Sequence, residues 1–227
     1  NLYGVLRNER PDYWFRNFSS NHFMWSTDLK FENEIKVQAT YDHPGRFMKL
    51  NANLALLSNL VYFDSLAVPA QEESSFIVFS ADIKKDFKLW KIRFLNQANF
   101  QFSANEEVLS LPAVSFRNST FFDHVFYFPW TDGHLSTQLG FDLYYFTPFY
   151  AYAYMPATGQ FYNQKEKKIG NYPFVDVFLN LKVKRTRIFL KFEHVTSGLL
   201  GNQYFTILHH PMNRRVFLFG LAWTFYD

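Results

Sequence analysis

The sequence predicts an all-β protein: an antiparallel, up-and-down transmembrane β-barrel with about ten strands in these 227 residues. Three observations predict this fold. Apolar and polar side chains alternate along segments of about ten residues, short and long connections alternate between those segments, and aromatic residues are abundant. A β-strand points successive side chains to opposite faces, so strict alternation indicates strands with one apolar face. We expect residues 1–227 to form a single barrel domain.

The composition fits such a barrel better than other membrane or nucleic-acid-binding proteins. The chain has 29 Phe, 14 Tyr and no Cys, and its mean hydropathy is −0.20. It lacks an apolar run of about 18 residues, so a transmembrane helix is not expected. In a membrane barrel, lipid-facing and lumen-facing residues alternate, which keeps the hydropathy moderate. The net charge of +3 is too small to indicate binding to nucleic acid.

The first three expected strands lie in the N-terminal quarter of the chain. A weaker strand at 2–8 precedes an irregular aromatic stretch. In the segment 28–42, the odd positions from Leu29 to Tyr41 are mostly apolar and the even positions are polar. A turn with Pro44 and Gly45 follows, and the next strand at 48–56 has alternate apolar positions from Met48 onward.

Seven further segments show the same alternation, with 113–128 the least regular. The last segment is the clearest, because Phe217, Phe219, Leu221, Trp223 and Phe225 share one face. Only Asp227 follows that segment. The seven segments are 77–84, 90–102, 113–128, 135–145, 175–183, 187–193 and 216–226.

The connections between these segments alternate in length. Short turns are expected near 43, 86, 131 and 185, the third being the run from Pro129 to Gly133, and long loops near 18, 66, 108, 160 and 205. An up-and-down barrel places every second connection at the same end. Outer-membrane barrels have short periplasmic turns and long extracellular loops, so this order predicts both the topology and its orientation.

A soluble β-sandwich or a lipocalin-like barrel would also alternate. In those folds the apolar face points into a core and the charged face points to water. Strands of 10 to 15 residues are long for that class. The polar faces here carry both signs of charge within one strand, as at Asp82 and Lys84, whereas the apolar faces are almost free of charge. We therefore favour the membrane barrel.

Several stretches in the second half have a recognisable sequence: AYAYMPATGQFY at 151–162, IGNYPFVDVFLN at 169–180, RIFLKFEHV at 187–195 and FGLAWTFYD at 219–227, with similar runs at 117–120 and 144–147. These stretches resemble the putative porin family of Bacteroidetes outer membranes. The resemblance is specific from about Leu111 onward. Members of that family are usually longer, so it implies that this sequence is the C-terminal portion of a larger protein and part of a larger barrel. It implies no catalytic residues.

Charged residues on the polar faces are the main functional candidates, because a water-filled lumen tolerates charge and takes a weak ionic preference from it. The alternative is a plugged interior in which the charges pair across strands. The predicted pore-lining residues are Lys30, Glu32, Lys36, Lys49, Asp82, Lys84, Lys91, Arg93, Asp142, Asp176, Lys182, Arg187, Lys191 and Glu193.

Aromatic residues near the ends of the expected strands suit the membrane interface, where an amphipathic ring lies between headgroups and acyl chains. The role of these residues would be structural. The predicted interface residues are Trp25, Tyr41, Trp90, Trp130, Tyr145, Tyr172 and Trp223.

The sequence thus predicts a porin-like barrel of a bacterial outer membrane that lets small polar solutes pass without an energy source. An accessory or structural barrel in a larger secretion or insertion complex is the alternative, and a lipid-cleaving barrel using His194 and Ser197 is a weaker one. The expected partners are membrane lipid and other outer-membrane proteins, not nucleic acid. We expect no enzymatic activity, and no metal or other cofactor, because zinc-ligand spacings, phosphate-binding loops and nucleophile elbows are absent from the sequence.

Overall fold

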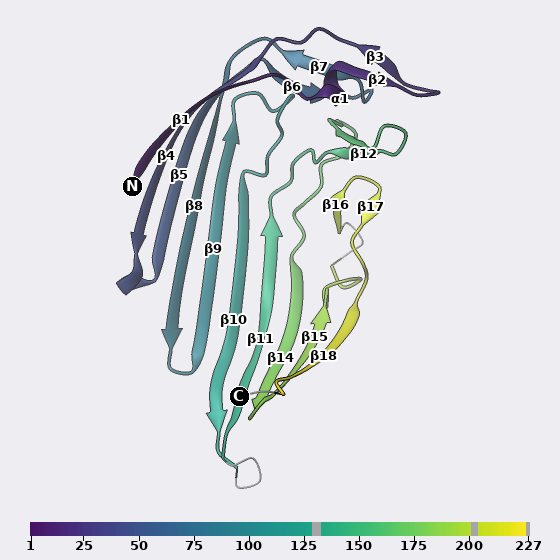
Figure 1. Cartoon of the computed structure of the whole chain (residues 1–227). Helices are drawn as coiled ribbons and strands as arrows, with labels where there is room; N and C mark the ends of the chain where they lie inside the picture. Colours follow the sequence, from purple (N-terminus) through teal and green to yellow (C-terminus); the bar gives the residue numbers. More distant parts are fainter. Residues whose placement is uncertain (129–132, 201–203, 226–227) are drawn as a thin grey trace.

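The computed structural model describes residues 1–128, 133–200 and 204–225, and these form an antiparallel sheet of ten strands (Figure 1). The strands pair in the order β1-β4-β5-β8-β9-β10-β11-β14-β15-β18, so each long strand lies beside the long strand that precedes it in the chain. The predicted all-β, up-and-down order is confirmed. The strands are β1 (Leu2–Glu9), β4 (Glu32–His43), β5 (Met48–Ser58), β8 (Phe76–Leu89), β9 (Ile92–Ser103), β10 (Val114–Phe126), β11 (Leu135–Phe146), β14 (Phe174–Val183), β15 (Thr186–Glu193) and β18 (Val216–Trp223).

Long connections gather at one end of the sheet and short connections at the other, which we call the loop end and the turn end (Figure 1). Among the described residues, four of the five long connections contain small elements, and the connection between β9 and β10 contains none. The small elements are α1 (Tyr13–Arg16) with β2 (Asn17–Ser19) and β3 (Met24–Ser26), β6 (Leu60–Phe63) with β7 (Pro69–Glu72), β12 (Ala153–Met155) with β13 (Gln160–Tyr162), and β16 (Phe205–Ile207) with β17 (His210–Pro211). The alternation of connection lengths is therefore confirmed.

Two short turns match the sequence prediction and one does not. The 3-10 turn η1 (Pro44–Arg46) joins β4 to β5, and Lys184 lies in the turn between β14 and β15 with a positive φ of 50°. The turn expected near 86 is instead at Trp90 and Lys91, because the sheet pairing of β8 with β9 continues to Leu89. The turn predicted from Pro129 to Gly133 lies largely outside the described residues.

The register divides the sheet into two faces. Asn51 of β5, Asp82 of β8 and Asn99 of β9 lie in one row across three strands, and we call their side the polar face. Leu54, Phe79 and Phe102 form a row on the opposite side, the apolar face. Since side chains alternate along every strand, these two rows fix the side of each residue in the regularly paired sheet.

None of the described residues forms a protein layer over the apolar face. Ile35 and Leu54 are 49% and 50% exposed, whereas their polar neighbours Glu34 and Asn53 are less exposed than they are. Among the described apolar residues that are buried, those in the ten strands are Phe76, Phe146 and Phe174, all near the loop end, and the rest belong to the connections. The apolar face therefore lacks the packing partner that a soluble sheet requires.

The core of the molecule lies among the long loops. Phe146, Ala151, Ile169, Tyr172 and Tyr204 pack with Phe174 at the loop end of β11 and β14. The sheet itself stays open: across the described residues, β1 pairs only with β4 and β18 pairs only with β15. No helix in these same residues is long and apolar enough to span a membrane.

Candidate functional site

The polar face is the hollowed side of the sheet. Three cavities of about 530, 310 and 380 Å³ lie along it. The first and second share Ser119 and Asp142, and the first and third share Asn180 and Phe189. All four of these residues lie on the polar face, so the cavities form one continuous hollow across β10, β11, β14 and β15.

Hydrogen bonds between strands order part of the polar face. The Gln97 Nε2 donates to Asp82 Oδ2 at 2.7 Å, and the Asn51 Nδ2 donates to Asp82 Oδ1 at 3.4 Å. The Asn53 amide likewise donates to the Ser80 hydroxyl at 3.2 Å. The Asp82 carboxylate thus lies between side-chain amides of the two neighbouring strands. The two hydrogen bonds that it accepts stabilise its charge without a cationic partner.

Ion pairs order two further parts of this face. Arg93 Nε lies 2.8 Å from Asp123 Oδ2 near the turn end. Lys191 Nζ lies 2.8 Å from Asp176 Oδ2 and 3.1 Å from Glu193 Oε1 near the loop end. One ammonium thus serves two carboxylates, which leaves a negative charge beside the first cavity.

Charge on the polar face is divided along the strands. The half toward the loop end carries seven carboxylates and four cations: Glu9, Glu32, Glu34, Asp82, Asp142, Asp176 and Glu193 against Arg7, Lys36, Arg117 and Lys191. The half toward the turn end carries the opposite excess, six cations and three carboxylates: Lys49, Lys84, Lys88, Arg93, Lys182 and Arg187 against Asp42, Asp86 and Asp123. A hollow lined in this way has opposite potentials at its two ends.

Aromatic rings interrupt the polar face between the two charged halves. Phe121 and Phe178 approach with ring centroids 6.1 Å apart, across the strand that carries Gly140. Phe189 lies opposite Gly220 in the same way. A Cβ at Gly140 would overlap the Phe121 side chain, and one at Gly220 would overlap the Phe189 ring. Gly220 therefore makes room for the Phe189 ring, and Gly140 allows the neighbouring strand to approach closely at Thr120 and Phe121.

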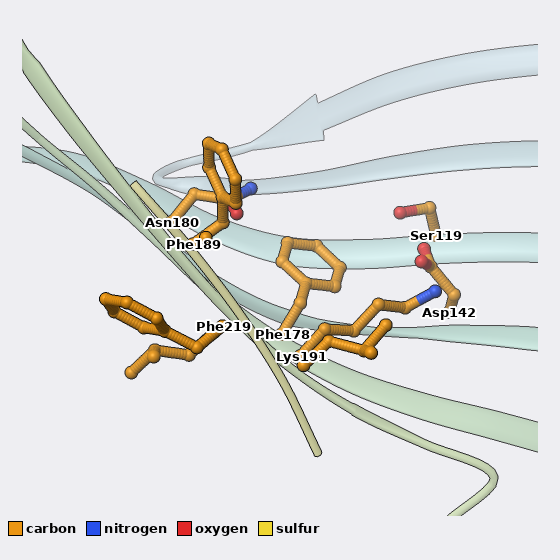
Figure 2. A pocket seen from close by; sticks show the side chains of 10 residues that line it. Ser119, Asp142, Phe178, Asn180, Phe189, Lys191 and Phe219 are labelled. Carbon is orange, nitrogen blue, oxygen red and sulfur yellow. The ribbon is translucent and has the colours of Figure 1, made fainter. Parts of the chain in front are cut away.

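Figure 2 shows the first cavity, with the Phe178 ring between Asn180 and Phe189 on one side and the Asp142 carboxylate on the other. Asp142 is directly opposite Asp176 in the register. Asp176 is satisfied by Lys191 and by the backbone N–H of His194, which donates to it at 2.8 Å. Within the described residues, the Asp142 side chain has neither an ion pair nor a hydrogen bond.

Twelve of the fourteen predicted pore-lining residues lie on the polar face of a strand. These are Glu32, Lys36, Lys49, Asp82, Lys84, Arg93, Asp142, Asp176, Lys182, Arg187, Lys191 and Glu193. The placement agrees with a lumen, and the lining of a pore by these residues stays a prediction.

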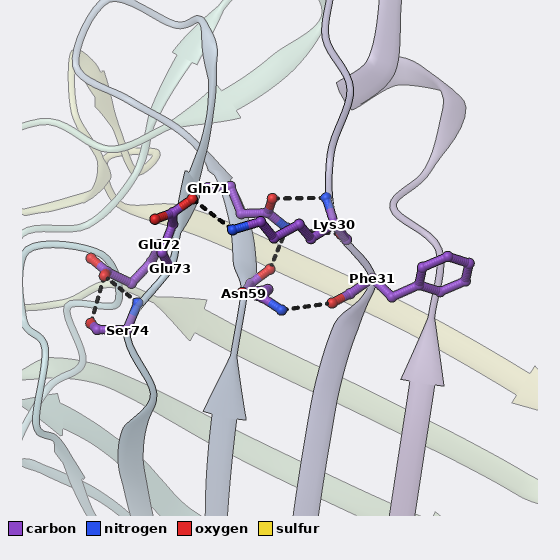
Figure 3. A network of polar contacts seen from close by, with 7 residues as sticks. All are labelled: Lys30, Phe31, Asn59, Gln71, Glu72, Glu73 and Ser74. Carbon is purple, nitrogen blue, oxygen red and sulfur yellow. Dashed lines mark hydrogen bonds and ion pairs between the residues drawn. The ribbon is translucent and has the colours of Figure 1, made fainter.

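The other two predicted pore-lining residues, Lys30 and Lys91, lie outside the strands. Lys30 precedes β4 in a loop-end network, where its backbone pairs with the Gln71 amide and its Nζ is 2.8 Å from Glu73 Oε1 (Figure 3). The hydrogen bond and charge of Lys30 lower the pKa of Glu73. Lys91 is in the β8–β9 turn, with its Nζ 2.9 Å from His124 Nε2. The alternation of side chains had placed both residues inside strands, but β4 begins at Glu32 and β9 at Ile92, later than expected.

The predicted interface aromatics divide into two groups. Tyr41, Trp90 and Trp223 are exposed near the turn end, and Tyr145 lies near the loop end with its hydroxyl donating to Asn171 Oδ1 at 2.8 Å. Their contact with lipid stays a prediction. Trp130 lies outside the described residues.

Trp25 and Tyr172 are buried in the loops and do not lie on the outer surface. Trp25 stacks on Phe18 at 4.7 Å, and its Nε1 donates to the Trp14 carbonyl. The Tyr172 hydroxyl lies 3.1 Å from His194 Nε2. Both residues were expected at the membrane interface because they are aromatic and lie near the ends of expected strands. These two properties do not distinguish an aromatic residue at the interface from one packed in a loop.

The pair considered for lipid cleavage does not form a nucleophile and base. His194 follows β15 and is buried, with Nδ1 at 2.7 Å from the Asn213 carbonyl oxygen. Because a carbonyl only accepts, Nδ1 donates to it, and the remaining nitrogen faces Tyr172. Ser197 contacts His194 through its backbone N–H, which donates to the His194 carbonyl at 3.0 Å.

The aromatic rings on the polar face were not predicted. Their signal in the sequence is a large apolar residue at a position where the alternation demands a polar one, as at Phe121, Phe178 and Phe189. The glycines that face Phe121 and Phe189 on neighbouring strands become visible as partners only when the register is known.

Comparison with known proteins supports one family. The sequence model of a family described as "Putative porin" matches residues 2–227, nearly the whole chain. No curated protein and no solved structure matches the chain.

Proposed function

Because the chain belongs to the putative porin family, we propose that it forms the wall of a passive outer-membrane channel for small polar solutes. The observation that carries this proposal is the combination of an exposed, unpartnered apolar face with a hollow, charged polar face. Acyl chains satisfy the first face and water satisfies the second. No step in passive passage requires a catalytic residue or a bound cofactor.

The open sheet edges belong to the same proposal. In a bilayer, the N–H and C=O groups along the free edges of β1 and β18 would lack partners, and each unsatisfied group costs several kcal/mol. We propose that further strands pair with both edges, so that the ten strands form one arc of a larger closed barrel. A larger barrel also suits a channel, since barrels of about eight strands are filled by side chains.

Cysteine cross-linking tests this closure, because the chain has no native Cys. Pairs of cysteines placed along β1 and β18 are expected not to cross-link within one chain in membranes. Pairs along β15 and β18, which are adjacent, provide the positive control. Efficient cross-linking of β1 to β18 would show that the ten strands close on themselves and would overturn the larger barrel.

Planar-bilayer recording tests the channel. We expect stepwise conductance, and we expect a charged thiol reagent to reduce it in Ser119→Cys, whose side chain lies in the hollow. Thr120→Cys places the thiol on the opposite face and provides the matched control. Silent membranes, together with co-purifying outer-membrane proteins, would refute the channel and favour an accessory barrel in a larger assembly.

A further inference from the structure

We propose that the hollow binds short, extended peptides with free termini and apolar side chains, and that it orients them along the wall. This inference deepens the proposed channel function by assigning it a solute class. The peptide ammonium would lie at Asp142, its side chains on Phe178 and Phe189, and its carboxylate at Lys182 and Arg187. The first and third cavities, which are lined by these residues and share Asn180, form the groove.

The ammonium end is indicated by an unbalanced pair of carboxylates. Asp142 and Asp176 are directly opposite on adjacent strands, an arrangement that destabilises a sheet unless a cation lies nearby. Lys191 lies 2.8 Å from Asp176 and is also paired with Glu193. No cation of the described residues pairs with Asp142, so a ligand ammonium would relieve the repulsion there.

The carboxylate end is indicated by two cations that face each other. Lys182 and Arg187 are directly opposite in the register of β14 and β15. Neither side chain has an ion pair or a hydrogen bond among the described residues. Asp123, which lines the same cavity, is paired with Arg93 at 2.8 Å. A ligand carboxylate would therefore meet two available donors.

Two aromatic rings line the middle of the groove, beside the Asn180 amide. Phe178 and Phe189 line the first cavity, and Phe189 extends into the third. Gly220 opposite Phe189 leaves the space that this ring occupies. An apolar wall between two polar ends favours a solute whose own ends are charged and whose middle is not, and it disfavours a simple ion.

The separation of the two ends sets the length of the peptide. Asp176, opposite Asp142, and Lys182, opposite Arg187, are both on β14 and are six residues apart. At roughly 3.3 Å per residue, the two ends are about 20 Å apart along the strand. An extended chain covers a similar distance per residue, so about six residues fit between the charges.

Blockage of single-channel current by the hexapeptide Ala-Ala-Phe-Phe-Ala-Ala tests the proposal. We expect the peptide with free termini to block at a concentration about fivefold lower, for each charged end, than its N-acetylated or C-amidated forms. Asp142→Asn should remove the advantage of the free amino terminus and leave the block by the N-acetylated form unchanged. Arg187→Gln combined with Lys182→Gln should do the same for the carboxyl terminus.

Matched controls distinguish the groove from the general charge of the wall. Asp86→Asn and Lys84→Gln also remove charges that have no ion pair among the described residues. Both residues line the second cavity and not the first or third, so the block should not change. Phe178→Ala combined with Phe189→Ala should weaken the block by free and capped peptides alike.

The outcomes separate this inference from the channel function. A channel that conducts but is blocked equally by free and doubly capped peptides would overturn the peptide groove and leave the channel intact. Stronger block by a neutral sugar than by the hexapeptide would overturn it as well. A silent protein would refute the channel function itself, and with it the inference that depends on it.

Discussion

Replacing Leu54 with Arg tests which solvent covers the apolar face. Leu54 is the seventh of eleven residues in β5, between Val37 and Phe79 on the adjacent strands, and is half exposed. A guanidinium at the middle of the hydrocarbon layer destabilises a membrane barrel by about 2 to 4 kcal/mol. In water, an exposed Leu changed to Arg would alter the free energy of unfolding by less than about 0.5 kcal/mol.

The matched control is Ala55→Arg, one residue further along the same strand. Its side chain points to the polar face, where it faces Lys36. Water hydrates the new guanidinium there, and repulsion from one partly exposed like charge contributes less than about 1 kcal/mol. The free energies are measured by denaturant unfolding from lipid vesicles, followed by the fluorescence of the five Trp residues. Equal effects of the two substitutions would refute the division of the sheet into lipid-facing and water-facing sides.

Three further predictions concern packing and the loops. Gly140→Ala should destabilise the protein by about 1 to 3 kcal/mol, since the new Cβ would overlap the neighbouring strand. In the control Gly4→Ala the new Cβ meets nothing within 4 Å, so the unfolding midpoint in denaturant should change very little. Equal effects of the two substitutions would contradict the packing at Gly140. Tyr172→Phe removes the hydroxyl that faces a buried imidazole and should cost about 1 to 3 kcal/mol, measured by thermal unfolding; an unchanged melting temperature would contradict it. Hydrogen bonds from the Ser74 side chain and backbone lower the pKa of Glu72. The contribution of this carboxylate to loop stability is therefore present above the usual pKa of a glutamate and is lost as the pH falls through the lowered value. Hydrogen exchange at the Ser74 amide should show this loss, and the same pH dependence in Glu72→Gln would contradict it.

The ten long strands could be predicted because each carries its own period-two pattern. In β4, the expected apolar residues Ile35, Val37 and Tyr41 are the exposed ones, and the polar residues between them are less exposed. The pattern is local to each strand, so it requires no knowledge of the partners. Strand ends were less accurate, as at Trp90, because a turn residue with a positive φ has no apolar or polar signature.

The least regular strand shows where the pattern fails. In β10, Asn118 lies on the apolar face, where its amide donates to Asn96 Oδ1 at 2.8 Å and its own oxygen accepts from the Thr120 hydroxyl. Phe121 lies on the polar face, against Gly140. Each exception is compensated by a residue on the same face. Asn118 bonds to Thr120, two positions along its strand, and to Asn96 on the neighbouring strand, and Phe121 lies against Gly140 on the other neighbouring strand. Such compensation depends on the fold and cannot be seen in one segment.

The candidate site was predictable in its charges but not in its arrangement. The alternation predicts that Asp142, Lys182 and Arg187 share one face. It does not predict that Asp142 opposes Asp176, because that pairing depends on the register between two strands separated by a long loop. The opposition of Lys182 and Arg187 follows from the predicted turn near 185, since a two-residue turn fixes the register of the strands that it joins. The division of charge between the two halves of the face likewise becomes visible only when the strands are aligned in the sheet.

Spin-label accessibility along β8 tests the central claim most directly. Single cysteines at residues 77 to 84 carry a nitroxide, and collisions with lipid-soluble oxygen and with a water-soluble nickel complex are measured in vesicles. We predict that Ile77, Phe79 and Ile83 favour oxygen, that Ser80 and Asp82 favour nickel, and that the preference alternates at every residue. Alternation with the opposite phase, or nickel access at all positions, would show that acyl chains do not cover the apolar face of this sheet.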